Sequence, residues 1–407
     1  MLMGLLAGCL PRNRPWKALP ITLYIAVGVE KAPDKATERQ QLKALRNQLL
    51  VLQNSFRDVQ PGVLLELIAL ENKRFVDEVR RRTRSGLGPD LMLVDSNTAE
   101  ELHQRKLSTL IPFPNPKSHL LEPEVVPYVQ LSNDRWFAMP VSLQPQMACF
   151  DRRRMSSAPQ TMKALLEASS NGKNLGLGLK LSSLMWTTGS LGALQAISQV
   201  RQGNPVSSEQ ISSIQQWLSW LRSAEFQRRL SLVSSQAELV KGLRSGRFDW
   251  ISCYGRDANL LRLELGTNLG LAPLPSGPGG AASPISTLRV WAYGRNSSHR
   301  QRRVAEALVN FTLSSPAQRG FTIQTQGGLP VSTEATLPVA SSSNLAALIT
   351  AQQQARQAHE LTESLIGLHT EKATLNRTLT RFRYGGLDSA EAASSLIETL
   401  RPRPSAP

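Results

Sequence analysis

Residues 89–97 have the sequence Pro89-Asp90-Leu91-Met92-Leu93-Val94-Asp95-Ser96-Asn97. Four apolar residues between a turn and a polar run are typical of a strand that is buried inside a sheet. A helix is predicted directly afterwards, over 98–105. Because parallel sheets bind ligands at the carboxyl ends of their strands, the polar residues that end this strand are candidates for ligand contact.

The same alternation of elements precedes this strand. We predict strands over 21–27 and 63–70 and helices over 36–56 and 74–83. In the first helix, apolar residues recur at helical spacing: Leu42, Leu45, Leu49, Leu52 and Phe56. Strand, helix, strand, helix and strand with short polar breaks predict a parallel sheet of the α/β class.

A second alternating region is predicted downstream, over about 175–275. The other predicted elements are an extended stretch over 136–151, a proline-led helix over 159–168, a helix over 217–230, strands over 249–254 and 288–293, a helix over 302–313 and a largely helical part from about 345. The turn cluster over 274–280 separates the second region from the strand that follows it.

Composition places the chain among globular proteins. Of its 407 residues, 41% are hydrophobic and 19% are charged, which excludes disordered and collagen-like chains. That length allows two domains or one large one. No apolar run reaches the roughly 18 to 20 residues that a transmembrane helix needs.

The charge balance is strongly basic, with 47 Lys and Arg against 31 Asp and Glu, a net charge of +16. The basic runs are scattered and are not interleaved with aromatic residues: Arg80-Arg81-Arg82, Arg152-Arg153-Arg154, Arg228-Arg229 and Arg302-Arg303. No nucleic-acid-binding motif accompanies them. We therefore interpret them as solvated helix faces, with no nucleic acid as partner, and as a source of weak attraction to an anionic membrane surface.

Catalytic and metal-binding motifs are absent from the sequence. The five histidines are far apart, and there is no His-Glu-x-x-His, Cys-x-x-Cys, phosphate-binding loop or Gly-x-Ser-x-Gly pattern. We therefore predict neither an enzyme nor a bound metal or cofactor.

The amino terminus contains Leu6-Ala7-Gly8-Cys9, which resembles the lipobox of bacterial lipoproteins. A polar, basic and proline-containing stretch follows, as expected of a tether. This interpretation makes residues 1–18 a signal remnant and tether with a lipid on Cys9. The alternative is an apolar terminus with a chance cysteine, because the preceding apolar stretch is short and carries no basic region.

The order of segments resembles a known family, the extracellular solute-binding proteins of ABC importers, in the sugar-binding group related to maltose-binding protein. The segments that carry the resemblance are 61–63, 89–102, 138–142 with 150–151, 159–166, 243–249, 274–279, 305–318, 327–331 and 387–393. Each is weak alone, and their common order is what makes the resemblance specific.

The family implies the type II periplasmic-binding-protein fold, in which two α/β lobes are joined at a hinge and a ligand cleft lies between them. We expect residues 19–139 plus 284–316 in one lobe and residues 140–283 plus 317–407 in the other. Ligand contacts that span both lobes would stabilise the closed state.

The function implied is that of the substrate-binding component of an ABC importer. Such a protein captures a mono- or disaccharide, or a glycoside-type compatible solute, and delivers it to permease subunits. We expect a monomer in the periplasm or at the cell surface. The alternatives are the same fold with a non-sugar solute, such as a polyamine, phosphate ester or metal complex, and a sensor or scaffold that acts on a signalling partner.

A sugar site needs side chains that donate and accept hydrogen bonds and rings on which the sugar can stack. The polar candidates in the first lobe stand at strand ends: Glu30, Asp95, Ser96 and Asn97. Helix capping is an equally good interpretation of Asp95. By resemblance, Gln144 occupies a position where the family often has an acidic ligand residue, and an amide there is suited to hydroxyl groups.

The aromatic candidates are Trp186, Tyr254 and Trp291, in that order. Trp186 precedes two threonines and a glycine, and core packing is its alternative. Cys149 and Cys253 fall in the same expected lobe, where an oxidising compartment would allow a bridge. We favour two buried free thiols.

Overall fold

The computed structural model of the chain describes residues 20–32, 34–111, 118–132, 135–325, 327–359 and 371–402. Cys9 and the tether predicted over 1–18 lie outside the described residues. None of the described helices is long and apolar enough to cross a membrane.

The strands are β1 (Ile21–Val29), β2 (Val63–Glu71), β3 (Leu91–Asp95), β4 (Ser108–Thr109), β5 (Gln130–Ser132), β6 (Arg135–Trp136), β7 (Met139–Asp151), β8 (Leu175–Gly178), β9 (Leu230–Val233), β10 (Trp250–Tyr254), β11 (Leu269–Ala272), β12 (Ser286–Gly294) and β13 (Leu329–Pro330). The helices are α1 (Lys35–Arg57), α2 (Phe75–Arg84), α3 (Ser96–Gln104), α4 (Met162–Ser170), α5 (Leu181–Leu184), α6 (Trp186–Ser190), α7 (Leu194–Arg201), α8 (Ser208–Glu225), α9 (Gln236–Arg244), α10 (Gly255–Leu265), α11 (His299–Thr312), α12 (Ser315–Thr325), α13 (Ser343–Gln357), α15 (Glu371–Arg383) and α16 (Ser389–Leu400).

One mixed sheet runs through the molecule in the order β2-β1-β3-β12-β7-β10-β8-β9. β1 pairs in parallel with β2 and β3, as the alternating sequence pattern predicts. The long strand β7 lies in the middle of this sheet and joins its two parts, because its first residues pair with β12 and its last residues pair with β10 and β11.

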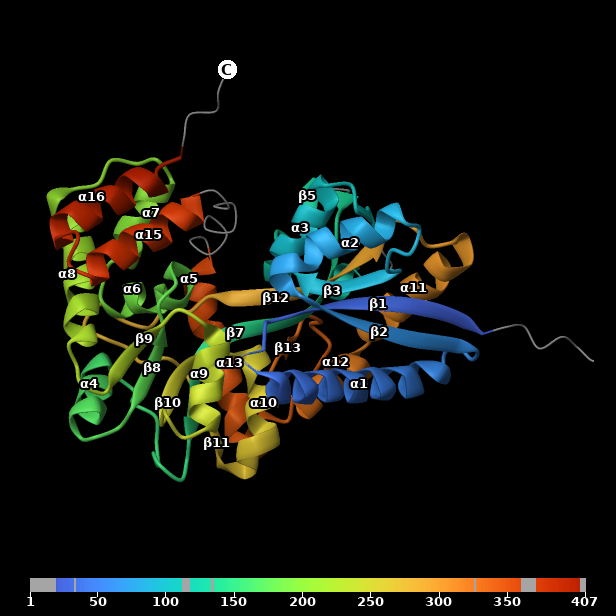
Figure 1. The fold of residues 1–407 in the computed structure, drawn as a ribbon, viewed down its shortest axis with the longest axis horizontal. Helices are drawn as coiled ribbons and strands as arrows, with labels where there is room; N and C mark the ends of the chain where they lie inside the picture. Colours follow the sequence, from blue (N-terminus) through green and yellow to red (C-terminus); the bar gives the residue numbers. More distant parts are fainter. Residues whose placement is uncertain are drawn as a thin grey trace, which may run out of the picture.

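The sheet therefore has two halves, each with its own helices (Figure 1). We call β1–β3 and β12, with α1–α3 and α11, the first half. We call β8–β11, with α4–α10, α13, α15 and α16, the second half. β7 and the start of β12 connect them. The two halves stand apart above these strands in the view, whereas below them α9 and α10 of the second half lie against α1 (Figure 1).

Helix caps explain two differences between the predicted and observed elements. The helix predicted over 217–230 begins at Ser208, where Ser207 and Gln210 form a capping box, and it ends at Glu225 so that β9 can start at Leu230. The helix predicted over 159–168 is not led by proline. It begins at Met162, and the side chain of Thr161 caps it by accepting a hydrogen bond from the Ala164 amide.

Cys149 and Cys253 form a disulfide, with their Cα atoms 5.8 Å apart. The prediction of two free thiols is therefore wrong. The cysteines are 104 residues apart in sequence, and the antiparallel pairing of β7 with β10 brings them together inside the core. That Cα separation lies in the range that a disulfide requires.

Candidate functional site

A cavity of about 430 Å³ lies between the two halves, on the side of β7 and β12 that carries α5 and α15. We call it the larger cavity. Its lining residues include Glu30, Asp95, Ser96, Asn97, Thr98 and Tyr128 from the first half, Lys180, Ser182, Ser183, Gln236, Tyr254, Arg256, Leu375 and Asn376 from the second half, and Ser286 and Thr287 from β12. Its volume is in the usual range of small-molecule sites.

Arg256 of α10 is the central charged residue of this site. Its guanidinium nitrogens lie 3.6 Å from Glu30 Oε1 and 3.9 Å from Asp95 Oδ2, both carboxylates of the first half. The guanidinium carbon also lies 4.6 Å from the centre of the Tyr254 ring. Burial lowers the pKa of Arg256, but the carboxylates of Asp95, Asp257 and Glu30 outweigh burial and hold that pKa above its ordinary value. Arg256 is therefore a positively charged residue of the second half that lies against two carboxylates of the first half.

Arg289 of β12 holds Asp95 from the other side. It donates to Asp95 Oδ1 over 3.3 Å, to the Leu93 carbonyl over 3.0 Å and to the Gly28 carbonyl over 3.3 Å. Its side chain is only 12% exposed. Burial lowers the pKa of Arg289, an effect that Asp95 opposes. This arginine is fully engaged with its own half, and its role is to fix the carboxylate.

Asp95 occupies the N-cap position of α3, but its side chain accepts no capping hydrogen bond. The carboxylate faces the two arginines instead. Helix capping, one of the two interpretations of Asp95 made from the sequence, is therefore not the role of its side chain.

Three polar atoms of this region have no hydrogen-bond partner among the described residues, although each is buried: Asn97 Oδ1, Gln144 Oε1 and Arg256 Nε. A buried polar group without a partner costs about 1–3 kcal/mol. Ordered water, an ion or a ligand is the usual partner of such groups.

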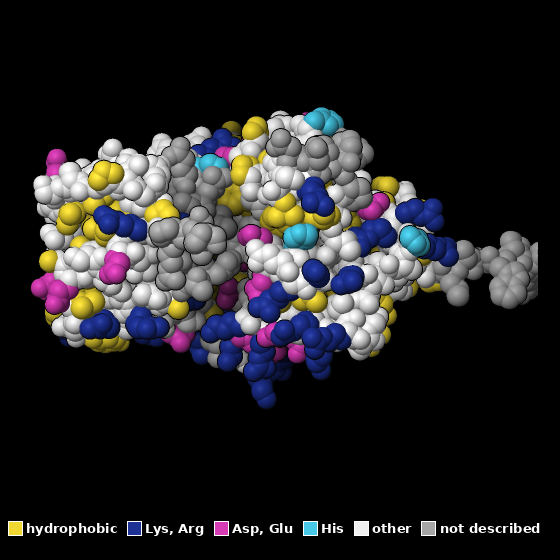
Figure 2. Space-filling view, turned by 90° about the horizontal axis from the view of Figure 1, so that it is seen from above, with side chains coloured by type: hydrophobic (Ala, Val, Ile, Leu, Met, Phe, Trp, Pro, Cys, Tyr) yellow, Lys and Arg dark blue, Asp and Glu magenta, His cyan; other side chains and the backbone are white. Residues whose placement is uncertain are grey.

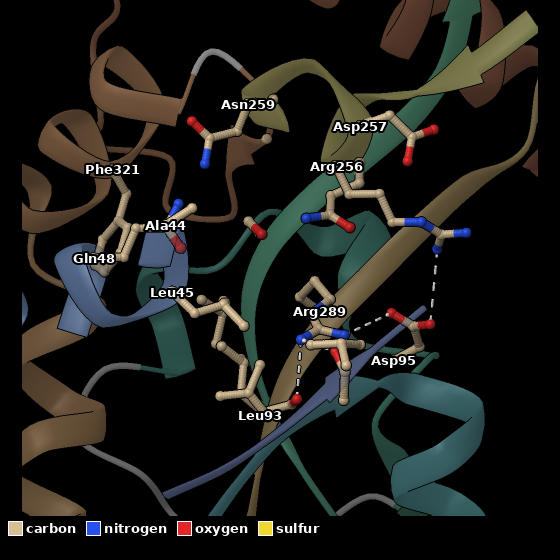
Figure 3. Close-up of a pocket in the computed structure, with 18 of the residues that line it drawn as sticks. Ala44, Leu45, Gln48, Leu93, Asp95, Arg256, Asp257, Asn259, Arg289 and Phe321 are labelled. Atoms are coloured by element: carbon tan, nitrogen blue, oxygen red, sulfur yellow. Dashed lines mark hydrogen bonds and ion pairs between the residues drawn. The ribbon is translucent and has the colours of Figure 1, made fainter. Parts of the chain in front are cut away.

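A second cavity of about 270 Å³, the smaller cavity, lies on the other side of the same three residues (Figure 3). Glu30, Asp95 and Arg256 line both cavities. Figure 3 shows Phe321, Ala44 and Leu45 at one side of this space and Arg256 and Asp95 at the other.

Five of the eight residues predicted to bind the ligand line the larger cavity, namely Glu30, Asp95, Ser96, Asn97 and Tyr254, while Gln144 lines the smaller one. Tyr254 is 6% exposed, and Arg256 stands over its ring, so this tyrosine presents little of a stacking face. Burial raises the pKa of its hydroxyl.

Trp186 and Trp291 are not brought to either cavity. Trp186 has no exposed surface and packs in the core of the second half. Trp291 is 3% exposed, and its indole N–H donates to Thr312 Oγ1 over 3.2 Å. Both tryptophans pack in the core, which was the alternative for Trp186.

Arg256, Lys180 and Asn376 line the larger cavity and were not predicted. A sequence signal existed for Arg256, because it follows the strand that ends at Tyr254 and strand ends carry ligand residues. No local signal marks Asn376, whose helix α15 reaches the cavity only through tertiary packing. Its side-chain oxygen accepts a hydrogen bond from the Leu181 amide over 3.0 Å.

The predicted basic runs are partly paired with acids. Arg80 pairs with Asp77 and Arg81 with Glu78, and Arg153 donates to Asp151. Figure 2 shows Lys and Arg gathered along one edge of the visible face, with Asp and Glu among them. The described residues contain no group of three or more His, Cys, Asp and Glu that could hold a metal ion.

Solved structures share this architecture. The GacH receptor of Streptomyces glaucescens GLA.O, solved unliganded and with acarbose, superposes with a TM-score of 0.65 over 93% of this chain and 97% of its own, at 13% identity. MalE3 of T. maritima with bound maltose has a TM-score of 0.63 over 93% and 99%, at 15% identity. An ABC transporter solute-binding protein from Thermotoga lettingae TMO with α-D-tagatose has a TM-score of 0.64 over 93% and 100%, at 13% identity.

The chain has the fold of these solute-binding proteins. The predicted type II periplasmic-binding-protein fold is thereby confirmed. No protein-family model and no curated protein matches the sequence.

Proposed function

We propose that the protein is the substrate-binding component of an ABC importer, which captures a small carbohydrate or glycoside-type compatible solute between its lobes and delivers it to the permease. The observation that carries the proposal is the larger cavity. It lies between the two halves, takes residues from both, and is lined by hydroxyl, amide and charged side chains that can bond to a sugar. We retain 19–139 plus 284–316 and 140–283 plus 317–407 as the proposed lobes.

The charges of the larger cavity favour a neutral, hydroxylated solute. Two carboxylates, Glu30 and Asp95, and two cations, Lys180 and Arg256, line this cavity, so the lining carries no net charge. Hydroxyl groups donate to carboxylates and accept from ammonium and guanidinium groups, and charge-assisted hydrogen bonds of this kind are the strong ones. A charged solute would leave one of these side chains without compensation.

Closure of the cleft follows from the position of the same residues. Glu30 and Asp95 belong to the first half and Arg256 to the second, and they already face one another at 3.6 to 3.9 Å. A solute that hydrogen-bonds to both sides binds the closed arrangement better than an open one, and it therefore shifts the hinge equilibrium towards closure.

The remaining parts of the proposal concern location and partners. A lipid on Cys9 would hold a monomer at the periplasmic or outer face of a membrane, beside the permease subunits. The disulfide between Cys149 and Cys253 supports an oxidising compartment. We propose no enzymatic activity, and no nucleic acid as a partner.

The test is a thermal-shift screen of the purified chain against neutral sugars, glycosides, polyamines and phosphate esters, followed by calorimetry of each hit. A ligand at 100 times its Kd stabilises the protein by about 2.7 kcal/mol. Asn97→Ala should weaken a sugar hit at least tenfold, because it removes an amide that lines the cavity. Asn54→Ala, the same substitution at an exposed position of α1, is the matched control and should leave the affinity unchanged.

Hits confined to polyamines or phosphate esters would keep the binding function and overturn the solute class. If no compound of the panel binds, the sensor or scaffold role takes precedence over transport of these solutes.

A further inference from the structure

The two cavities differ in the chemistry of their walls. The smaller cavity has a mostly apolar wall of half-buried side chains from both halves and from α12: Ala44, Leu45, Leu93, Val141, Leu260 and Phe321. The larger cavity is lined by hydroxyl, amide and charged groups together with apolar side chains such as Leu181, Leu288 and Leu375. Apolar side chains that meet solvent together in a hollow are typical of a binding surface.

The wall between the cavities is made of weak contacts. Arg256 makes two ion pairs at 3.6 and 3.9 Å, and no hydrogen bond of its side chain is found among the described residues. Its Nε is buried and has no partner. Arg289, beside it, donates three hydrogen bonds. Of these two arginines, Arg256 is therefore the less firmly held at the junction of the two cavities.

Gln144 provides a second unfilled group on the same path. It lines the smaller cavity from β7, and its side-chain oxygen is buried without a partner. A ligand that extends from the larger cavity past Arg256 into the smaller one would pass the guanidinium group of Arg256 and then the Gln144 side chain before it reached the apolar wall.

We propose that the protein binds a glycoside across both cavities, with the sugar ring in the larger cavity, the glycosidic oxygen at Arg256 and a short aryl or alkyl aglycone in the smaller cavity against Leu45 and Phe321. This inference rests on the proposed function and names its substrate class. The sizes agree with it. The smaller cavity measures about 270 Å³, and an apolar cavity of about 150 Å³ already accommodates benzene.

The experiment measures Kd by calorimetry for matched methyl and phenyl glycosides of glucose, galactose and mannose. Burial of a phenyl group against this wall should make the phenyl glycoside of the preferred sugar roughly ten- to a hundredfold tighter than its methyl partner. Ala44→Phe fills the smaller cavity from α1 and should abolish this preference while methyl glycoside binding persists. Asn47→Phe adds the same side chain at an exposed position of α1 and should keep the preference.

Equal affinities for methyl and phenyl glycosides would overturn the inference and leave the proposed function standing. A phenyl preference that survives in Ala44→Phe would also overturn it, because the aglycone would then lie elsewhere. Failure of all six glycosides to bind would count against the proposed sugar-binding function itself, and the inference would fall with it.

Discussion

The disulfide between Cys149 and Cys253 allows a quantitative prediction about stability. The bridge spans 104 residues of sequence and joins the connecting strand β7 to β10 of the second half. In the chain-entropy model, a bridge that closes a loop of about 100 residues stabilises the folded state by about 4.7 kcal/mol, because it restricts the unfolded chain. Reduction should therefore lower the free energy of unfolding by about 3–5 kcal/mol.

The assay is urea unfolding of the oxidised protein, the reduced protein and the Cys149→Ala/Cys253→Ala double variant. The reduced protein and the double variant should both unfold at lower urea concentration. The free energy of unfolding of the variant should fall by a further ~1–2 kcal/mol, since two buried sulfurs are removed. A count of thiols in denatured, unreduced protein is the control. It should find no thiol when Cys9 carries the lipid and Cys9 alone when the protein is produced without it. Three reactive thiols, or equal urea midpoints for oxidised and reduced protein, would refute the reasoning.

Three further perturbations have defined outcomes. Arg289→Ala leaves the half-buried Asp95 without its closest cation. It should lower the free energy of unfolding by about 3 kcal/mol in urea titrations. A loss under about 1 kcal/mol would show that water replaces the arginine. Hydrogen bonds from Arg153 hold the pKa of Asp151 below its ordinary value of 3.8. The resulting stabilisation of the fold is present above that value and is lost as pH falls through the lower, folded-state pKa. Asp151→Asn should therefore flatten the acid limb of a plot of Tm against pH, and an unchanged limb would contradict this. A methyl group on Gly255 would collide with the backbone carbonyl of Gly327, which cannot move aside as a flexible side chain would. Gly255→Ala should therefore lower the Tm by several degrees in calorimetry. An unchanged Tm would show that the backbone yields.

The strand-end residues were predictable because their position depends on local pattern. The apolar run Leu91–Val94 followed by Asp95-Ser96-Asn97 is enough to predict a buried strand and a polar end. Since parallel strands place their carboxyl ends at one edge, Glu30 after β1 and Asp95 at the end of β3 had to lie close together.

Trp186 shows where this reasoning stops. Polar residues after a tryptophan are compatible with a cleft and with a core helix alike, and the choice depends on which side of α6 the rest of the second half covers. Tertiary packing buries Trp186 completely, and Thr187 is buried with it as the acceptor for the Trp217 N–H, at 2.7 Å. No local pattern contains that information.

What the sequence by itself determined about this protein is the order of its elements, the parallel sheet of the first half and the polar strand ends, because hydrophobic period and turn residues act over short distances. Only the tertiary structure decided the pairing of Cys149 with Cys253, the burial of Trp186 and Trp291, and the placement of Arg256 against Glu30 and Asp95. Each of these joins segments far apart in the chain. Their contacts depend on how β7 and β12 connect the two halves, and that geometry is a property of the whole fold.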